Sequence, residues 1–131
     1  MAKLFLKFIP FFYFPAFVFL LHIILISFGV YQRLPWFDIP MHFLGGLAIS
    51  YSSVLFFRYF KEKGFFSINR TFLFVLIIVS TVSFVAVLWE FFEFFLHLFV
   101  SVSFQPSVAD TMKDLFIGML GGLVWGILWR K

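Results

Sequence analysis

The chain has 131 residues, of which 63% are hydrophobic, 25% are aromatic and only 12% are charged. A water-soluble domain of this length could not cover so much apolar surface, so the composition excludes the ordinary soluble globular class. The formal net charge is +4, but the basic residues stand at the ends of apolar segments rather than in a basic stripe, so nucleic acid is not an expected partner. The absence of cysteine excludes disulfides and thiolate-ligated metals.

Four apolar segments are long enough to cross a bilayer as helices, because about 20 residues at ~1.5 Å each span its ~30 Å hydrocarbon core. We expect an all-α membrane protein, a four-transmembrane-helix bundle that forms a single domain over residues 1–131. The helices are predicted at about 15–31, 38–60, 71–99 and 108–129. Pro15 is expected to begin the first helix, and Asp38 to cap the second, which has Pro40 in its first turn.

The basic residues predict the orientation of these helices. Eight of the ten Lys and Arg residues belong to the two chain ends and the connection between the second and third helices. Only Arg33 and Lys113 fall on the other side. Because cytoplasmic connections hold the excess of Lys and Arg, we expect both termini of this integral membrane protein to be cytoplasmic. The expected location is a bacterial or archaeal plasma membrane.

The acidic residues gather on the opposite, outward side. Five of the six belong there: Asp38, Glu90, Glu93, Asp110 and Asp114. Spacings of three and four place the acidic residues of each helix on one face, together with His42 in the second helix and His97 in the third. Burying a charge in a spanning helix costs about 2.5–3.5 kcal/mol on insertion scales, so such residues are functional or tightly paired.

Adjacent carboxylates repel one another, and a divalent metal ion would supply the missing positive charge. Carboxylate and imidazole ligands on facing helices suit magnesium, manganese, iron or zinc. We therefore predict a metal site of unknown identity with Glu90, Glu93, Asp110 and Asp114 as ligands. Asp38 and His42 are predicted catalytic residues that orient substrate or move protons.

Several of these residues have plainer readings. Asp38 and Asp110 could be helix N-caps, and Lys113 or Arg33 could neutralise carboxylates without a metal. The roles of His22 and His97 stay open, although an interhelical hydrogen bond is the favoured role of His22. Close helix packing is expected at Gly45, Gly46, Gly118, Gly121, Gly122 and Gly126. In a second reading, Gly45 and Gly46 leave room for a substrate beside His42.

Three motifs resemble those of the VanZ-like and YjdF-like families of small bacterial membrane proteins. They are Asp38 and His42 followed by Gly45 and Gly46, then Glu90 with Glu93, then Asp110 with Asp114 before Gly118. The resemblance implies that these acidic and histidine residues are the positions that matter in the family. The chain departs from the VanZ-like pattern at Ile39, Glu93 and Asp114, where Lys, Gln and Asn are usual, and the acidic changes favour cation binding.

The leading functional hypothesis is a metal-dependent activity on a lipid or lipid-linked cell-envelope substrate. The alternatives are a proton or cation pathway, in a homo-oligomer, and a non-catalytic accessory protein. A pathway needs polar groups down to the cytoplasm, whereas below Glu90 the third helix offers mainly Ser80, Thr81 and Ser83. This favours a one-sided site. Membrane lipids are the expected partners, and whether the protein is an enzyme is left open.

Overall fold

The structure, a computed structural model, describes residues 2–99 and 107–129, and their side chains from residue 9 onward. Its elements are α1 (Ala2–Ser27), α2 (Val30–Arg33), the 3₁₀ helix η1 (Pro35–Phe37), α3 (Asp38–Glu62), α4 (Thr71–Phe99) and α5 (Val108–Leu128). The described residues contain no strand. Four helices are long and apolar enough to cross a membrane, over Ile9–Ser27, Pro35–Glu62, Thr71–Phe99 and Val108–Leu128. The predicted all-α, four-span architecture is confirmed.

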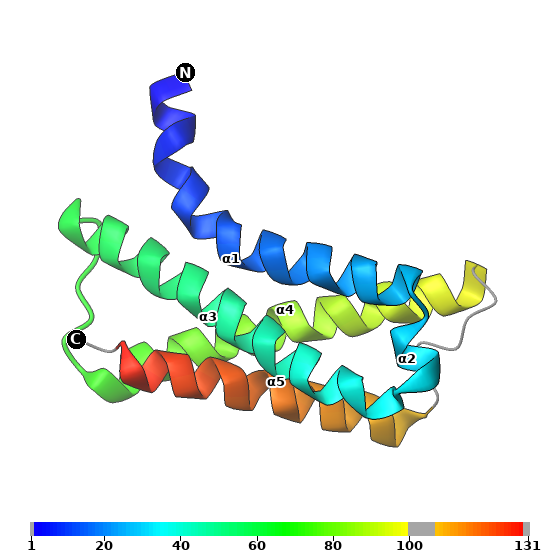
Figure 1. Ribbon diagram of the computed structural model, residues 1–131. Helices are drawn as coiled ribbons and strands as arrows, with labels where there is room; N and C mark the ends of the chain where they lie inside the picture. Colours follow the sequence, from blue (N-terminus) through cyan, green and yellow to red (C-terminus); the bar gives the residue numbers. More distant parts are fainter. Residues whose placement is uncertain (1, 100–106, 130–131) are drawn as a thin grey trace.

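The helices alternate in direction along the bundle (Figure 1). α1 and α4 run one way, and α3 and α5 run the other way, parallel to each other. α3 is the central element, because it packs on α5, α1 and α4, whereas α1 and α4 hardly contact each other. The first turns of α3 and α5 therefore lie at the same end of the bundle as the last turns of α1 and α4.

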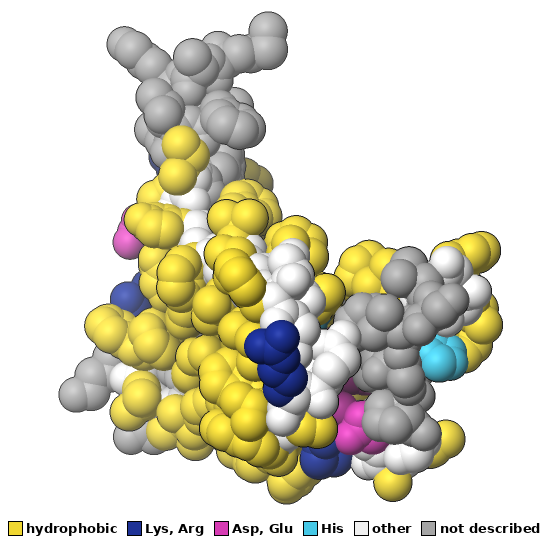
Figure 2. Space-filling model, turned by 45° about the vertical axis from the view of Figure 1, so that its right-hand side comes forward, with side chains coloured by type: hydrophobic (Ala, Val, Ile, Leu, Met, Phe, Trp, Pro, Cys, Tyr) yellow, Lys and Arg dark blue, Asp and Glu magenta, His cyan; other side chains and the backbone are white. Residues whose placement is uncertain are grey.

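The outer surface of the bundle is apolar. Large side chains such as Phe84 and Leu88 of α4 and Phe12 of α1 are exposed, and hydrophobic side chains cover most of the described part of the face in Figure 2. Few hydrophobic side chains are fully buried among those the structure describes; Ile78 and Val82 are two of them. A surface of this kind suits hydrocarbon as solvent, because a helix satisfies most of its backbone polar groups internally while its side chains contact lipid.

Glycines bring α3 and α5 into backbone contact. A Cβ atom at Gly46 would lie 1.9 Å from the carbonyl oxygen of Gly118, and one at Gly121 would lie 2.2 Å from that of Phe43. One turn after Gly46, Ser50 Oγ donates a 2.9 Å hydrogen bond to the Gly122 carbonyl. Small residues let spanning helices approach closely, so the predicted glycine packing is confirmed at this interface.

The remaining glycines divide into two kinds. Cβ atoms at Gly122 and Gly126 would lie 2.8 Å from Val82 Cγ2 and 3.3 Å from Ile78 Cγ2, so both glycines receive side chains of α4. A Cβ at Gly45 would meet nothing within 4 Å. Close packing is therefore the wrong interpretation of Gly45, which faces open space.

The first helix differs from its predicted bounds, because it begins at Ala2 instead of at Pro15 and ends at Ser27. Pro15 lacks an N–H group, so the Phe11 carbonyl loses that helical donor. Ser52 Oγ of α3 donates a hydrogen bond to this carbonyl. A donor from a neighbouring helix thus lets α1 continue through Pro15, and Figure 1 shows α1 changing direction in its first half, as expected of a helix with internal prolines.

Candidate metal centre

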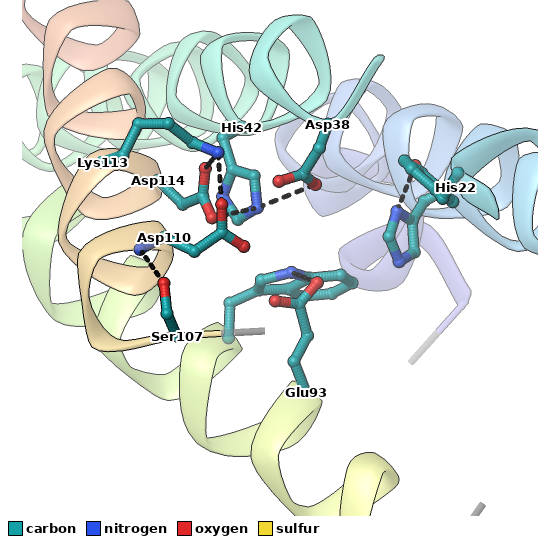
Figure 3. A network of polar contacts seen from close by, with 10 residues as sticks. His22, Asp38, His42, Glu93, Ser107, Asp110, Lys113 and Asp114 are labelled. Carbon is teal, nitrogen blue, oxygen red and sulfur yellow. Dashed lines mark hydrogen bonds and ion pairs between the residues drawn. The ribbon is translucent and has the colours of Figure 1, made fainter. Parts of the chain in front are cut away.

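The first turns of α3 and α5 place His42 opposite Asp114. His42 Nε2 lies 3.3 Å from Asp38 Oδ1 on its own helix and 4.0 Å from Asp114 Oδ2 on α5 (Figure 3). The two helices are parallel and in register: the 72-residue separation of Ser50 and Gly122 also relates His42 to Asp114. Asp38, His42 and Asp114 each offer one ligand atom, and these atoms lie within 4.8 Å of one another.

Two glutamates of α4 complete a second group around the same histidine. Glu90 and Glu93 are 6% and 5% exposed, so both are buried although they carry carboxyl groups. With His42 they offer three ligand atoms within 4.8 Å of one another. In Figure 3, Glu93 rises from α4 toward His42 and Asp38. His42 is thus common to both groups, which draw on three helices.

Lys113 supplies positive charge on the α5 side of the site. Its Nζ lies 2.5 Å from Asp110 Oδ1 and 3.3 Å from Asp114 Oδ1. Asp110 belongs to neither ligand group; its carboxyl contacts Lys113, and its backbone N–H donates to Ser107. Lys113 is therefore placed to neutralise Asp110 and contacts one of the two carboxylate oxygens of Asp114. Arg33, the other basic residue considered, is exposed.

The predicted N-caps are not formed by the aspartates. Phe37 precedes α3 with a helical backbone conformation, because η1 continues directly into α3, and Asp38 is the first residue of the helix. At α5 the cap is Ser107, whose hydroxyl accepts a 3.2 Å hydrogen bond from the Asp110 N–H. The Asp38 carboxyl is left to contact His42.

Aromatic side chains extend the site toward α1. His22 Nδ1 lies 2.7 Å from the Tyr31 hydroxyl, which joins α1 to α2. Burial raises the pKa of Tyr31, so its hydroxyl stays protonated and can donate to His22. The His22 ring meets the Trp89 ring edge-on with centroids 5.0 Å apart, and Trp89 Nε1 donates a 2.9 Å hydrogen bond to Glu93 Oε1.

Sequence reasoning missed Trp89 and Tyr31 as members of the site. Trp89 lies four residues before Glu93, so the two share a helix face, and this spacing was the available signal. The signal is weak in a chain that is 25% aromatic. His97 was predicted to share that face, but it is exposed and belongs to neither ligand group.

A cavity of about 130 Å³ adjoins the site between α1, α3 and α4. His22, Asp38 and His42 line it together with Trp89, and the rest of the lining is almost entirely apolar, including Val18, Ile49 and Val85. The polar cluster is therefore not sealed within the bundle. It borders a space that a second molecule could enter.

The ligand spacing is close to what one ion requires. Two ligand atoms each ~2.1 Å from a shared zinc ion lie at most about 4.2 Å apart, and the larger hard cations allow more. Groups whose ligand atoms lie within 4.8 Å need small side-chain adjustments to close on an ion. The carboxylate and imidazole chemistry fits the ions expected from the sequence.

Comparison with known proteins places the chain in a family without assigning a reaction. The family model described as predicted membrane protein, DUF2238, matches residues 3–131. No curated protein and no solved structure matches the chain. The match agrees with the sequence motifs on one point, that the chain belongs to a family of membrane proteins. With nearly its whole length matched, the chain belongs to the DUF2238 family of predicted membrane proteins.

Proposed function

We propose that the protein binds a divalent metal ion between α3, α4 and α5 and uses it on a lipid or lipid-linked substrate of the cell envelope. One observation carries the proposal: His42 belongs to two groups of ligand atoms, one with Asp38 and Asp114 and one with Glu90 and Glu93. Buried carboxylates from three helices meeting at one imidazole are costly without a compensating cation.

The geometry ranks the ligands. Five residues have an atom in a three-residue group, and we propose four of them as ligands: Glu90, Glu93, Asp114 and His42. Asp110 is the weakest of the four acidic ligands predicted from sequence, since its Oδ1 contacts Lys113. The fifth, Asp38, has its Oδ1 3.3 Å from His42 Nε2, the nitrogen that also faces Asp114, and we assign it the role of orienting the His42 ring.

The location of the site favours a membrane-embedded substrate. The ligand groups lie within the candidate spans, and the adjoining cavity is largely apolar. A bound divalent ion would polarise a phosphoryl or carbonyl oxygen and lower the pKa of a bound water. The resemblance of the sequence motifs to VanZ-like and YjdF-like proteins is part of this proposal, but it does not identify a reaction.

The rival function, a proton or cation pathway across the membrane, is less well supported. Below the site, Ser53 of α3 and Thr81 and Ser83 of α4 donate their hydroxyl hydrogen bonds to carbonyls of their own helices. Ser50 donates to Gly122 across the α3–α5 contact. These hydroxyls satisfy the backbone and do not form a continuous chain from the carboxylates through the described part of the bundle.

Removing one ligand charge at a time tests the metal proposal. Glu93→Gln and Asp114→Asn keep side-chain shape but remove a negative ligand, so each should lower the metal content of the purified protein. Each should also reduce the loss of melting temperature that a chelator causes in the wild type. Glu62→Gln, at an exposed acid far from the site, is the matched control. An absent chelator effect in the wild type, with both variants as stable or more stable, would show that shared protons and ion pairs suffice.

The proposed orientation is tested by labelling. Gln32 in α2 and Ser67 between α3 and α4 are exposed and lie at opposite ends of the bundle. In intact cells, a cysteine at position 32 should react with an impermeant maleimide, and a cysteine at position 67 should react only after permeabilisation, because the cytoplasmic side holds the excess of basic residues. The reverse pattern would place the metal centre on the cytoplasmic side.

A further inference from the structure

The cavity between α1, α3 and α4 has a polar end and an apolar body. His22, Asp38 and His42 form the polar end, next to the proposed metal ligands. From there the lining continues along α3 to Ile49 and along α4 to Val82, which is a distance of roughly 10–16 Å at ~1.5 Å per residue. The cavity thus has the polarity of an amphiphile: a polar group at one end and a hydrocarbon segment behind it.

Its size limits what can enter. A dry cavity of ~150 Å³ in a protein core binds benzene, and this one is about 130 Å³. A helix of another protein copy, ~10–12 Å across with side chains, is too wide. α1 and α4, which form the two walls, have few contacts beyond those of the Trp89 ring with Phe19 and His22. We therefore infer that the space between them opens to the surrounding bilayer. The molecules present there are lipids, whose chains are narrow and apolar.

We propose that this cavity admits a segment of one acyl chain of a bilayer phospholipid, laterally between α1 and α4, and holds the lipid's polar part beside His42. That the bound lipid is a substrate rests on the proposed function. That a lipid binds in the cavity can be tested without reference to the metal. The phospholipid enters from the leaflet that contains the metal centre.

Gly45 keeps the cavity open. Its neighbour Gly46 is needed for contact with α5, whereas a Cβ at Gly45 would meet nothing within 4 Å. Gly45 lines the cavity beside His42. The absence of a side chain at this position costs helix propensity and gains no packing, so the space itself is the feature that glycine preserves.

Trp89 connects the cavity to the metal ligands. Its ring reaches from α4 to α1, where it contacts Phe19 with centroids 6.0 Å apart and His22 at 5.0 Å. Its Nε1 hydrogen bonds Glu93 Oε1. Trp89 therefore lines the polar end of the cavity between α1 and α4 and holds one proposed ligand at the same time.

A photolabelling experiment tests the inference. The full chain is reconstituted in bilayer nanodiscs that contain a phosphatidylglycerol with a diazirine in one acyl chain, and labelled residues are identified by mass spectrometry. In the wild type, cavity residues such as Ile49 and Val82 should be labelled, as should the lipid-facing Phe84 and Val124. Gly45→Leu and Val85→Phe fill the cavity, so they should lose the cavity labels and keep the lipid-facing ones.

Two controls keep the result interpretable. Gly45→Ala adds one methyl group to open space and should retain the cavity labels. Val87→Phe makes the same change as Val85→Phe two residues away on the exposed side of α4, and should also retain them. Retained labels on Phe84 and Val124 in every variant show that the protein is still folded in the bilayer. An unlabelled cavity in the wild type, or equal cavity labelling in Gly45→Leu and wild type, overturns the inference.

Metal content, measured on the same samples, separates this inference from the proposed function. Gly45→Leu should keep the metal content of the wild type, because residue 45 is in neither ligand group. Cavity labels in a wild-type protein that holds no metal would support the acyl-chain site and contradict the metal proposal. Bound metal in a wild-type protein without cavity labels would support the metal proposal and contradict the acyl-chain site.

Discussion

Gly46→Ala should prevent α3 and α5 from packing as they do in the wild type. The added Cβ would lie 1.9 Å from the Gly118 carbonyl oxygen and 2.8 Å from its carbonyl carbon, so the obstacle is backbone that no rotamer change can move. Forcing extra volume into a packed interface costs about 1–3 kcal/mol and occasionally more, and we expect the upper end. The measurement is the apparent melting temperature in detergent, followed by tryptophan fluorescence, with size-exclusion chromatography to detect aggregation.

The neighbouring glycine supplies the matched control. Gly45→Ala meets no atom within 4 Å and exchanges the poorest ordinary helix former for the best, so it should be neutral or stabilising by up to about 1 kcal/mol. The two variants have the same composition and differ only in which face of α3 carries the methyl group. Equal melting temperatures for the two variants would contradict the α3–α5 contact.

His42→Ala should have the second large effect, because it removes the one side chain that both ligand groups share. It leaves Asp38 and Asp114 without the imidazole that lies 3.3 and 4.0 Å from their carboxylate oxygens. Removing one partner of a buried charged cluster costs on the order of 3 kcal/mol. We expect a lower melting temperature, and loss of bound metal greater than in either Glu93→Gln or Asp114→Asn.

The control is His97→Ala, at an exposed histidine of α4 outside both ligand groups. It should retain the metal content and melting temperature of the wild type. Elemental analysis and thermal unfolding of both variants decide the matter. A His42→Ala protein as stable and as metal-rich as His97→Ala would contradict the role of His42 as the common ligand.

The number and type of helices could be predicted because apolar length is a local property, and 71–99 and Thr71–Phe99 coincide. The start of α1 could not. Proline at position 15 indicates a helix start when only α1 is considered, but Ser52, on another helix, donates to the Phe11 carbonyl. The same limit applies to Gly45 and Gly46, which are adjacent and identical residues: only the packing of the helices turns Gly45 to open space and Gly46 to α5.

The candidate site was predictable to the extent that charge in a membrane is costly. Asp38, Glu90, Glu93 and Asp114 stand out in an apolar chain, and the alternating helix directions bring them to one end. Which of them approach His42 depends on rotation about each helix axis and on competing partners. Lys113 contacts Asp110 and Asp114, so it competes with His42 and any metal ion for these carboxylates, and which contacts form depends on the reach of the lysine side chain. An uncharged residue of the site such as Trp89 has no large free-energy cost in the membrane, so its presence in the sequence does not indicate a site.

The backbone contact between α3 and α5 has a mechanical consequence. Gly46 and Gly118 meet one helical turn below His42 and Asp114, so the two helices cannot slide or rotate against each other near the site without a steric clash. The glycines of α5 that receive Val82 and Ile78 of α4 lie further along the bundle, two or more turns away from Glu90. We therefore expect the α3–α5 pair to be the rigid part of the site, and α4 to be the helix that can move. If the ligand groups open, we expect α4 to move relative to the α3–α5 pair, and both glutamates and Trp89 to move together because they belong to one helix.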